Sequence, residues 1–220
     1  MERKVIITSD GSSTIHLPEW DEHYHSKHGA IQEAKHVFIK NGLSLFSNQK
    51  IDILEIGFGT GLNSFITFLK APKLNLEIDY VGVEAYPVAL EEIEKLNYVK
   101  ELKALEFEIV FREMHQQDWE KSNIISSSFV MTKRKQFFDE ISDFEKYNLI
   151  YFDAFGARVQ PELWTEDIFE KMFEALKSGG VLVTYCAKGS VRRAMQKVGF
   201  LVEKLPGPPG KREMLRATKK

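Results

Sequence analysis

Apolar runs of strand length alternate with segments of helical periodicity along most of the chain. Residues 51–56 (IDILEI) and 78–83 (IDYVGV) are short and mostly apolar, and each precedes a segment whose apolar positions have helical spacing. This alternation predicts a doubly wound α/β sheet. The expected strands span residues 51–56, 78–83, 107–112, 129–132, 148–152, 181–185, 200–205 and 213–217, and the expected helices span residues 29–41, 62–69, 88–105, 165–176 and 190–197.

The two ends of the chain have hairpin patterns. Residues 5–8 and 14–17 are strand candidates around the turn dipeptide Asp10-Gly11, and the last two expected strands flank the turn GPPG at residues 207–210. The second pattern predicts an antiparallel hairpin at one edge of the sheet. We therefore divide the chain into an N-terminal hairpin and helix extension, residues 1–45, and a main domain, residues 46–220.

Composition narrows the class of protein. Hydrophobic residues make up 43% of the 220 residues, which is enough for a folded core, and the single Cys186 excludes a disulfide framework or a multi-cysteine zinc site. No stretch approaches the roughly 18–20 apolar residues of a membrane-spanning helix, and the first residues lack the apolar core of a signal peptide. We expect a soluble, cytoplasmic protein that does not bind a membrane.

The charges are unevenly placed, although the formal net charge is only -2. Up to Tyr185 there are 20 basic and 30 acidic residues, whereas from Cys186 onward there are 10 basic and 2 acidic residues. A basic segment thus follows an acidic body. It is either a solvated helix face with a charged tail or a surface for a phosphate-bearing partner.

A glycine cluster, residues 55–61 (EIGFGTG), lies between the first main strand and its helix. Glycines allow the backbone to turn sharply and to approach a ligand closely. The third glycine comes one residue earlier than in the dinucleotide-binding pattern G-x-G-x-x-G. Glu84 ends the next strand, where a carboxylate can accept hydrogen bonds from two ribose hydroxyls. The cluster and Glu84 together favour a nucleoside-bearing cofactor over a purely structural turn.

Several motifs together resemble a known family. The pattern acidic-x-G-x-G-x-G is similar to the first motif of class I S-adenosylmethionine-dependent methyltransferases. The full set resembles the methyltransferase domain of the bifunctional tRNA 5-methylaminomethyl-2-thiouridine biosynthesis protein and its stand-alone relatives. The resemblance covers almost the whole chain and rests on residues 55–63, 153–155, 161–164, 191–193, 199–200 and 210–215.

The resemblance implies a fold, a cofactor and a reaction. The fold is the class I methyltransferase, Rossmann-like doubly wound sheet with an antiparallel edge strand. The cofactor is S-adenosyl-L-methionine, and its methyl group passes to the amine of 5-aminomethyl-(2-thio)uridine at the wobble position in the tRNA anticodon loop. A flavin-dependent oxidase half would need several hundred further residues, so a separate oxidase is expected to act on the same pathway.

The expected cofactor-binding residues come from three regions. The glycine cluster and the following helix supply most of them, and residues before or in the first helix are expected to close over the cofactor. Relatives carry an acidic residue after the third main strand for the adenine, whereas this chain offers Gln136. The full set is Glu55, Gly57, Phe58, Gly59, Gly61, Asn63, Glu84, Gln136, Tyr24, Ser26 and Glu33.

Asp153 and Phe155 are the expected catalytic residues. Asp153 ends a central strand, where its carboxylate can orient the amine and take up the released proton; the alternative is a turn cap. Phe155 is expected to form an apolar wall beside the methyl group, or to belong to the core. Trp164 and Lys188 are candidates for contacting the substrate, although a tryptophan at a helix start also suits packing.

Four basic residues are candidates for binding tRNA phosphates. Arg192 and Arg193 lie in the helix that follows the strand at 181–185, and Lys211 and Arg212 precede the last strand. Internal salt bridges are the alternative for each. Phe155 or Trp164 could stack on a splayed anticodon base.

Three histidines, His23, His25 and His28, lie close together in the sequence near Glu22. They lie outside the family motifs, and methyl transfer to an amine needs no metal, so we expect no metal site. Two other functions stay open. One is methylation of a small-molecule or protein amine, and the other is a non-catalytic RNA-binding module whose glycine cluster is structural.

Overall fold

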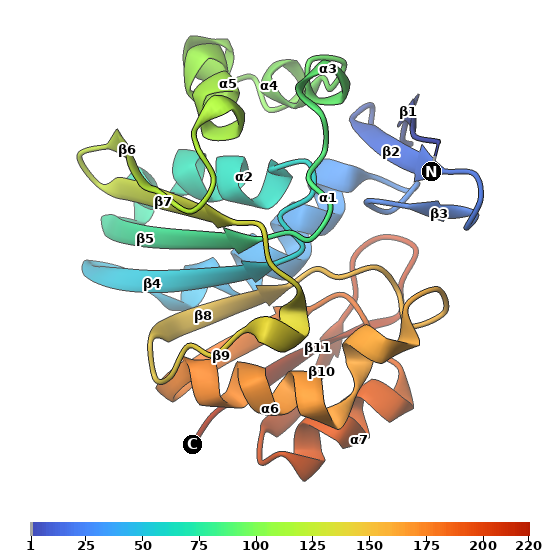
Figure 1. Cartoon of the computed structure of the whole chain (residues 1–220), viewed down its shortest axis with the longest axis vertical. Helices are drawn as coiled ribbons and strands as arrows, with labels where there is room; N and C mark the ends of the chain where they lie inside the picture. The colour runs from blue at the N-terminus through green and yellow to red at the C-terminus, as the bar shows by residue number, and fades with distance from the viewer. Residues whose placement is uncertain (1) are drawn as a thin grey trace.

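The computed structural model describes residues 2–220, and its centre is an eight-stranded mixed sheet in the order β10-β11-β9-β8-β4-β5-β7-β6 (Figure 1). A second sheet has the order β1-β2-β3. The strands are β1 (Lys4–Ile7), β2 (Ser13–Leu17), β3 (Glu22–His23), β4 (Gln49–Ile56), β5 (Leu76–Val83), β6 (Ser122–Ser126), β7 (Phe129–Arg134), β8 (Tyr147–Phe152), β9 (Leu176–Thr184), β10 (Leu201–Pro206) and β11 (Glu213–Thr218).

Seven α-helices connect or flank these strands. They are α1 (Ala30–Ala34), α2 (Leu62–Lys70), α3 (Leu90–Ile93), α4 (Tyr98–Glu101), α5 (Glu108–Gln116), α6 (Glu166–Ala175) and α7 (Gly189–Lys197). The π-helix η1 (Lys35–Lys40) continues α1, and short 3-10 helices are η2 (Leu43–Leu45), η3 (Ala71–Leu74), η4 (Leu105–Phe107), η5 (Phe138–Glu140) and η6 (Pro161–Trp164).

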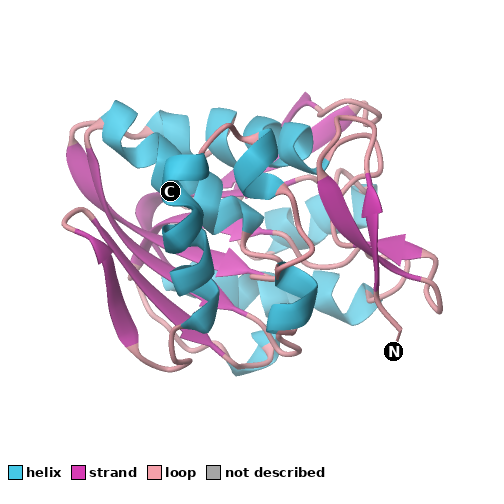
Figure 2. Ribbon diagram, turned by 90° about the horizontal axis from the view of Figure 1, so that it is seen from above, coloured by secondary structure: helices cyan, strands magenta, loops and turns pink. Residues whose placement is uncertain are grey.

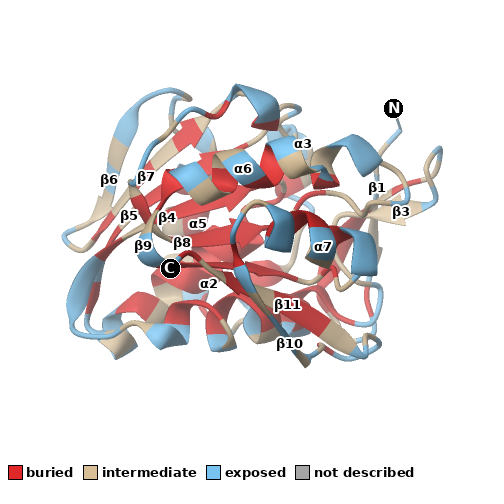
Figure 3. Ribbon diagram, turned by 90° about the horizontal axis from the view of Figure 1, so that it is seen from below, coloured by how far each residue is buried: buried red, intermediate tan, exposed pale blue. Residues whose placement is uncertain are grey.

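The central strands are parallel and buried on both faces. β4 pairs in parallel with β5 on one side and with β8 on the other, and Ile53 and Leu54, neighbours in β4, point into different core clusters. Helix α2 and the first helix cover one face and α6 and α7 cover the other, so buried residues lie on both sides of the sheet (Figure 3). Two-sided burial explains why these strands are apolar runs rather than alternating patterns.

The strand order places a topological switch point between β4 and β8. The chain leaves β4 towards β5 and later returns to the other side of β4 as β8. The loops after the two strands therefore diverge, and the crevice between them is where open α/β sheets bind ligands. The glycine cluster follows β4 and Asp153 follows β8, so both flank this crevice.

The N-terminal hairpin is confirmed as β1 and β2, and β3 adds a third antiparallel strand. This small sheet is separate from the large one and lies beyond the carboxyl ends of β4 and β5 (Figures 1 and 2). The C-terminal hairpin is also confirmed. β10 and β11 pair antiparallel at one edge of the large sheet.

Two expected elements were wrong, and one strand was missed. Residues 107–112 form the end of η4 and the start of helix α5 rather than a strand: Phe111 and Met114 share a buried face, whereas Ile109 is 72% exposed. The expected helix at 88–105 consists of the short helices α3 and α4. The polar segment before β7 contains β6, an antiparallel strand at the opposite edge of the sheet.

No helix in residues 2–220 has the length and apolar character needed to cross a membrane.

Candidate functional site

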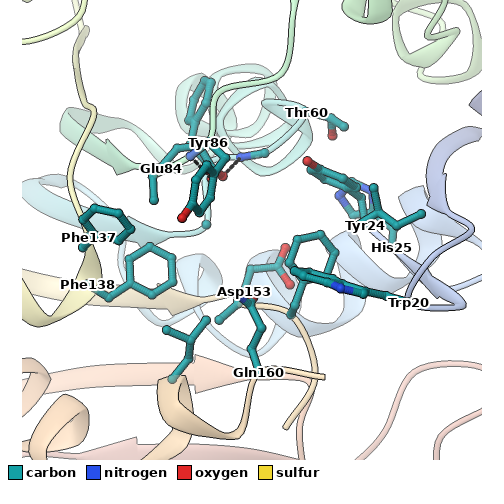
Figure 4. A pocket seen from close by; sticks show the side chains of 18 of the residues that line it. Trp20, Tyr24, His25, Thr60, Glu84, Tyr86, Phe137, Phe138, Asp153 and Gln160 are labelled. Carbon is teal, nitrogen blue, oxygen red and sulfur yellow. Dashed lines mark hydrogen bonds between the residues drawn. The ribbon is translucent and has the colours of Figure 1, made fainter. Parts of the chain in front are cut away.

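A cavity of about 950 Å³ lies at the carboxyl ends of β4, β5 and β8. Its floor is the glycine cluster, and its walls come from the loops after the three strands, from η5 and from the N-terminal sheet. Figure 4 shows Asp153 between two groups of aromatic residues, Phe137 and Phe138 on one side and Trp20 and Tyr24 on the other. Segments far apart in the sequence thus enclose one site.

At two positions of the cluster, close contacts and the backbone conformation favour glycine over any other residue. Gly57 has φ +87°, and a Cβ there would lie 2.6 Å from the carbonyl oxygen of Asp153. Gly59 has φ +49°, and a Cβ there would lie 3.2 Å from the ring of Tyr24. A side chain at either position would be strained and would displace a neighbour that lines the cavity. The cluster is therefore a cradle in which backbone forms the surface.

Glu84 is held at the cavity by two backbone donors. Its Oε2 accepts a hydrogen bond from Gly59 N at 3.0 Å, and its Oε1 accepts one from Tyr86 N at 3.0 Å. A carboxylate oxygen can accept more than one hydrogen bond, so both oxygens keep capacity for hydroxyl donors. This arrangement suits the two hydroxyls of a ribose.

A buried polar network connects β4, α2 and Asp153. Asn63 Nδ2 donates to Glu55 Oε1 and to Asp153 Oδ2, both at 2.9 Å, and the Tyr80 hydroxyl donates to Glu55 Oε2 at 2.8 Å. Glu55 does not line the cavity and is buried. Glu55 was expected to bind the cofactor directly. In the structure it instead fixes the side-chain amide of Asn63, which lines the cavity.

The oxygen of that amide has no partner within the protein. Asn63 lines the cavity, and its Oδ1 is buried without a hydrogen bond in residues 2–220. Nδ2 lies between two carboxyl oxygens that accept its hydrogen bonds, so the other end of the amide is the oxygen. A buried acceptor without a donor is costly, so this atom fits a ligand that supplies an N–H group.

Burial sets the protonation of the two carboxyls. The pKa of Asp153 rises to about 7, chiefly through burial and then through the charge of Glu33, while the hydrogen bond from Asn63 and the charge of Lys211 oppose the rise. Burial also raises the pKa of Glu55 well above its ordinary value. Asp153 therefore changes charge near neutral pH, which suits a group that accepts a proton.

The wall beside Glu84 is aromatic. Tyr86 is 64% exposed and Phe137 is 51% exposed, and their rings meet edge to face at 5.9 Å. Asp139 lines the same wall, whereas Gln136 does not line the cavity and donates to Glu140 O at 2.9 Å. The expected contact from Gln136 is thus not supported, and Asp139, three residues later, is an acidic residue that does line this wall.

The N-terminal sheet forms a roof over the cavity. The Tyr24 ring lies 5.0 Å from the Phe155 ring, and the Trp20 ring lies 5.8 Å from it. Arg158 Nη2 donates to the carbonyl oxygens of Trp20 and Asp21 and to Glu22 Oε2, at 3.0–3.1 Å. The sequence predicts a hairpin but carries no signal for this docking, because the contacts join residues more than 130 positions apart.

Two expected closing residues lie behind the roof. Ser26 and Glu33 do not line the cavity. The backbone N of Ser26 donates to Glu33 Oε2 at 2.8 Å, and Glu33 also forms an ion pair with Lys211. Tyr24 alone of the three faces the cavity (Figure 4).

The expected substrate residues divide into three groups. Phe155, which was expected to be catalytic or to belong to the core, lines the cavity. Trp164 is 5% exposed, packs on Phe152 and donates from Nε1 to Phe155 O, so the structure supports the packing alternative and not a surface for a base. The exposed cations lie outside the cavity, at α7 and the C-terminal hairpin. They include Lys188, Arg193 and Arg212.

Helix α5 contributes a residue that the sequence did not indicate. His115 Nε2 lies 3.1 Å from Thr60 O, and its Nδ1 lies 2.8 Å from Phe111 O. Its ring packs where a Cβ at Gly61 would be, 2.6 Å from Nε2. His115 therefore holds the far side of the glycine cluster in place. The sequence carries no signal for this role, because the contact joins residues 55 positions apart.

In the described part of the chain, no group of three or more His, Cys, Asp or Glu side chains is arranged to hold a metal ion. The His23 ring stacks on the His16 ring at 4.5 Å, and His25 N donates to Thr14 Oγ1 at 3.1 Å. These contacts give His23 and His25 structural surroundings within the roof.

The doubly wound sheet, the glycine cradle after β4 and the paired carboxyls Glu84 and Asp153 define a class I methyltransferase fold with a cavity for a nucleoside-bearing cofactor. Comparison with known families agrees: a model described as S-adenosyl-L-methionine-dependent methyltransferase matches residues 83–220. The chain belongs to this family.

Curated relatives give a narrower similarity. The chain is 30% identical over 214 residues to the tRNA 5-methylaminomethyl-2-thiouridine biosynthesis bifunctional protein MnmC of Idiomarina loihiensis, covering 89% of this chain and 35% of that protein. It is 32% identical over 227 residues to the protein of the same name from Leptospira interrogans, covering 96% of this chain and 34% of that protein. The chain thus spans about a third of the length of these relatives.

Solved structures confirm the fold. MnmC2 from Aquifex aeolicus superposes with a TM-score of 0.78 at 24% identity, over all of this chain and 70% of that chain. Spermidine synthase from Thermotoga maritima superposes with a TM-score of 0.55 at 16% identity, over 99% of this chain and 73% of that chain. Both identities are low, so these structures support the architecture alone.

Proposed function

We propose that this protein transfers a methyl group from S-adenosyl-L-methionine to the amine of 5-aminomethyl-(2-thio)uridine at the tRNA wobble position, giving 5-methylaminomethyl-(2-thio)uridine. The names of the relatives supply the substrate. The observation that carries the proposal is that Glu84 and Asp153 line one cavity together with the glycine cradle. A cofactor and an amine can meet there.

The residues present fit this cofactor. We assign the ribose hydroxyls to Glu84, and the adenine to the space beside Tyr86 and Phe137, where Asp139 can accept from its amine. The cradle of Gly57, Phe58 and Gly59 takes the amino-acid end, whereas Gly61 faces His115 and not the cavity. The unpaired Oδ1 of Asn63 can accept from the ammonium group of the ligand. When bound, S-adenosylmethionine supplies an electrophilic methyl carbon on its sulfonium.

Asp153 would orient the amine and receive its proton. In the transfer, the bond from nitrogen to the methyl carbon forms as the carbon–sulfur bond breaks, and one N–H proton leaves. The amine must be neutral to attack, so a carboxylate that accepts one of its N–H groups directs the lone pair towards the methyl carbon. Its raised pKa of about 7 makes Asp153 a better proton acceptor than an ordinary aspartate. Phe155 forms the apolar wall beside it.

The tRNA would lie across the exposed cations outside the cavity. The exposed Lys188, Arg193 and Arg212 and the half-buried Arg192 are the residues proposed to contact phosphates. The relatives are named bifunctional, and this chain matches only part of them, which is consistent with a separate flavin-dependent oxidase acting on the same nucleoside. A tRNA substrate implies a cytoplasmic location.

The test is transfer of labelled methyl groups from S-adenosylmethionine to tRNA from cells that lack this modification. We expect label in tRNA, its loss on nuclease treatment, and 5-methylaminomethyl-(2-thio)uridine in nucleoside mass spectrometry. Label that survives nuclease would favour methylation of a protein or small-molecule amine. Absence of S-adenosylmethionine binding in calorimetry would favour a non-catalytic RNA-binding module.

A further inference from the structure

The tip of the C-terminal hairpin reaches the first helix beside the active site. Lys211 Nζ forms an ion pair with Glu33, and the ring of His28 lies against Gly210. His36 Nε2 lies 2.8 Å from Pro206 O. Lys211 was expected to bind a tRNA phosphate, but its charge already has a partner inside the protein.

Lys211 is also connected to the segment that carries Asp153. Its Nζ lies 3.8 Å from the centroid of the Tyr185 ring, and the Tyr185 hydroxyl donates to Ala154 O at 2.8 Å. Glu33 is 8% exposed and is fixed from its other side by Ser26 N. The ammonium group thus joins a buried carboxylate to the aromatic ring that holds the backbone next to Asp153.

Polar and titratable groups act on Asp153 from several elements. They are Glu33 in α1, Asn63 in α2, Glu55 in β4, Tyr80 in β5, Tyr98 in α4, Tyr185 after β9 and Lys211 before β11. Burial raises the pKa of Tyr185 well above its ordinary value, so this phenol stays neutral. Glu33 raises the pKa of Asp153 and Lys211 lowers it, so the ion pair contributes two opposed effects.

We propose that Lys211, Glu33 and Tyr185 form a positioning unit for Asp153, and that Lys211 acts on this carboxyl rather than on tRNA. This inference rests on the role proposed for Asp153. The adjacent Arg212 is exposed and has no ion pair in the described residues, so the two neighbouring cations have different tasks.

The first experiment measures the pKa of Asp153 directly. The free protein is labelled with ¹³C at the aspartate carboxyls, the Asp153 signal is assigned with Asp153→Asn, and its shift is followed against pH by NMR. We expect Lys211→Met to raise this pKa and Glu33→Gln to lower it, each by about half to one pH unit. Lys211→Arg keeps the cation and should stay near the wild-type value.

Unchanged values, or shifts of both variants in the same direction, would overturn the proposal. Circular dichroism checks the fold of each variant. Glu33→Gln alters one charge at nearly constant volume, so its direction decides the question if Lys211→Met does not fold. The measurement needs no tRNA. A wild-type protein that methylates no tRNA would contradict the proposed function and leave this result standing.

The second experiment compares Lys211 with its neighbour in tRNA binding. We expect Lys211→Met to leave the slope of log K against log salt concentration unchanged. The matched variant Arg212→Met should reduce the slope by about one, because one phosphate contact is lost. A reduction in Lys211→Met as large as that in Arg212→Met would overturn the proposal.

Discussion

Asp153 is a carboxyl group whose protonation is set by its surroundings. Burial raises its pKa to about 7, far from the ordinary 3.8, and its Oδ2 is fixed by Asn63. Near neutral pH the group can therefore exist as a carboxylate that orients an amine or as an acid that has received its proton. The amide of asparagine has nearly the same shape but cannot take up the proton.

We expect Asp153→Asn to lower kcat for tRNA methylation by at least about 100-fold, the low end of the range for a general base. S-adenosylmethionine affinity, measured by calorimetry, should change little because Glu84 and the glycine cradle remain. Asp118→Asn, at an exposed position, is the matched control. Turnover close to that of the wild type would remove Asp153 from the mechanism.

The same substitution should change how stability depends on pH. The folded protein binds a proton at Asp153 up to pH of about 7, whereas the unfolded chain releases it near 3.8, so this group destabilises the fold progressively as pH rises between the two values. The free energy of unfolding of Asp153→Asn, relative to that of the wild type, should therefore rise by roughly 2–4 kcal/mol between pH 4 and pH 8. Urea unfolding at both pH values measures this difference, and a difference independent of pH would contradict the raised pKa.

Substitution of Glu84 tests whether this carboxylate contributes to cofactor binding. Glutamine at this position keeps the size but loses the charge and one acceptor oxygen, so Glu84→Gln should weaken S-adenosylmethionine binding by about 10- to 100-fold. Calorimetry measures the affinity, and the exposed Glu91→Gln is the control. An affinity within about twofold of the wild type would mean that Glu84 only holds the loop, through Gly59 and Tyr86.

Residues at strand ends were predictable, whereas residues that support them were not. Glu84 and Asp153 each follow an apolar run, so the sequence alone puts them at one edge of the sheet. Asp139 and the ion pair of Glu33 with Lys211 depend on how loops and the extension fold back over that edge. Such contacts join residues up to 178 positions apart and leave no local pattern.

At the scale of elements, burial on both faces made the central strands easy to recognise. Residues 107–112 were misassigned because they form a short, mostly apolar run, for which strand and helix patterns cannot be told apart. The helix buries Phe111 and Met114 and leaves Ile109 exposed, which only the packing of α5 against α2 decides. The edge strand β6 is mostly polar and intermediate in burial, so it lacks an apolar run.

The N-terminal sheet is the element whose role depends most on tertiary contacts. Arg158→Ala removes three hydrogen bonds to residues 20–22 and should loosen the roof. We expect faster hydrogen exchange in residues 15–24 and faster S-adenosylmethionine dissociation in stopped flow. The melting temperature should fall by less than about 4 °C, because exposed ion pairs contribute about 1 kcal/mol or less. Arg216→Ala, which breaks an ion pair with Glu203 in the distant hairpin, should leave exchange and dissociation unchanged.

At the scale of the whole molecule, the basic C-terminal segment offers fewer cations to a partner than its composition suggests. Five of its cations pair with carboxylates in the described residues: Lys197, Lys204, Lys211, Arg216 and Lys219. Of the five cations left, Lys188, Arg192 and Arg193 lie in or just before α7 and Arg212 lies at the hairpin tip, whereas Lys220 ends the chain after β11. Arg192 and Arg212 both act on Glu213, after its larger interaction with Lys204, to lower the pKa of that carboxyl, which places the two arginines in one cluster.

This cluster gives the prediction that separates tRNA from a small substrate. Replacing Arg192 and Arg193 together with methionine should weaken tRNA binding and reduce the slope of log K against log salt by about two, since each phosphate contact releases about one counterion. The matched control is Lys100→Met with Lys103→Met, an exposed pair at α4 on the opposite side of the sheet from α7 (Figure 1). An unchanged slope in the arginine variant would mean a solvated helix face. Methylation of a small amine by the same cavity would then need no contact with α7.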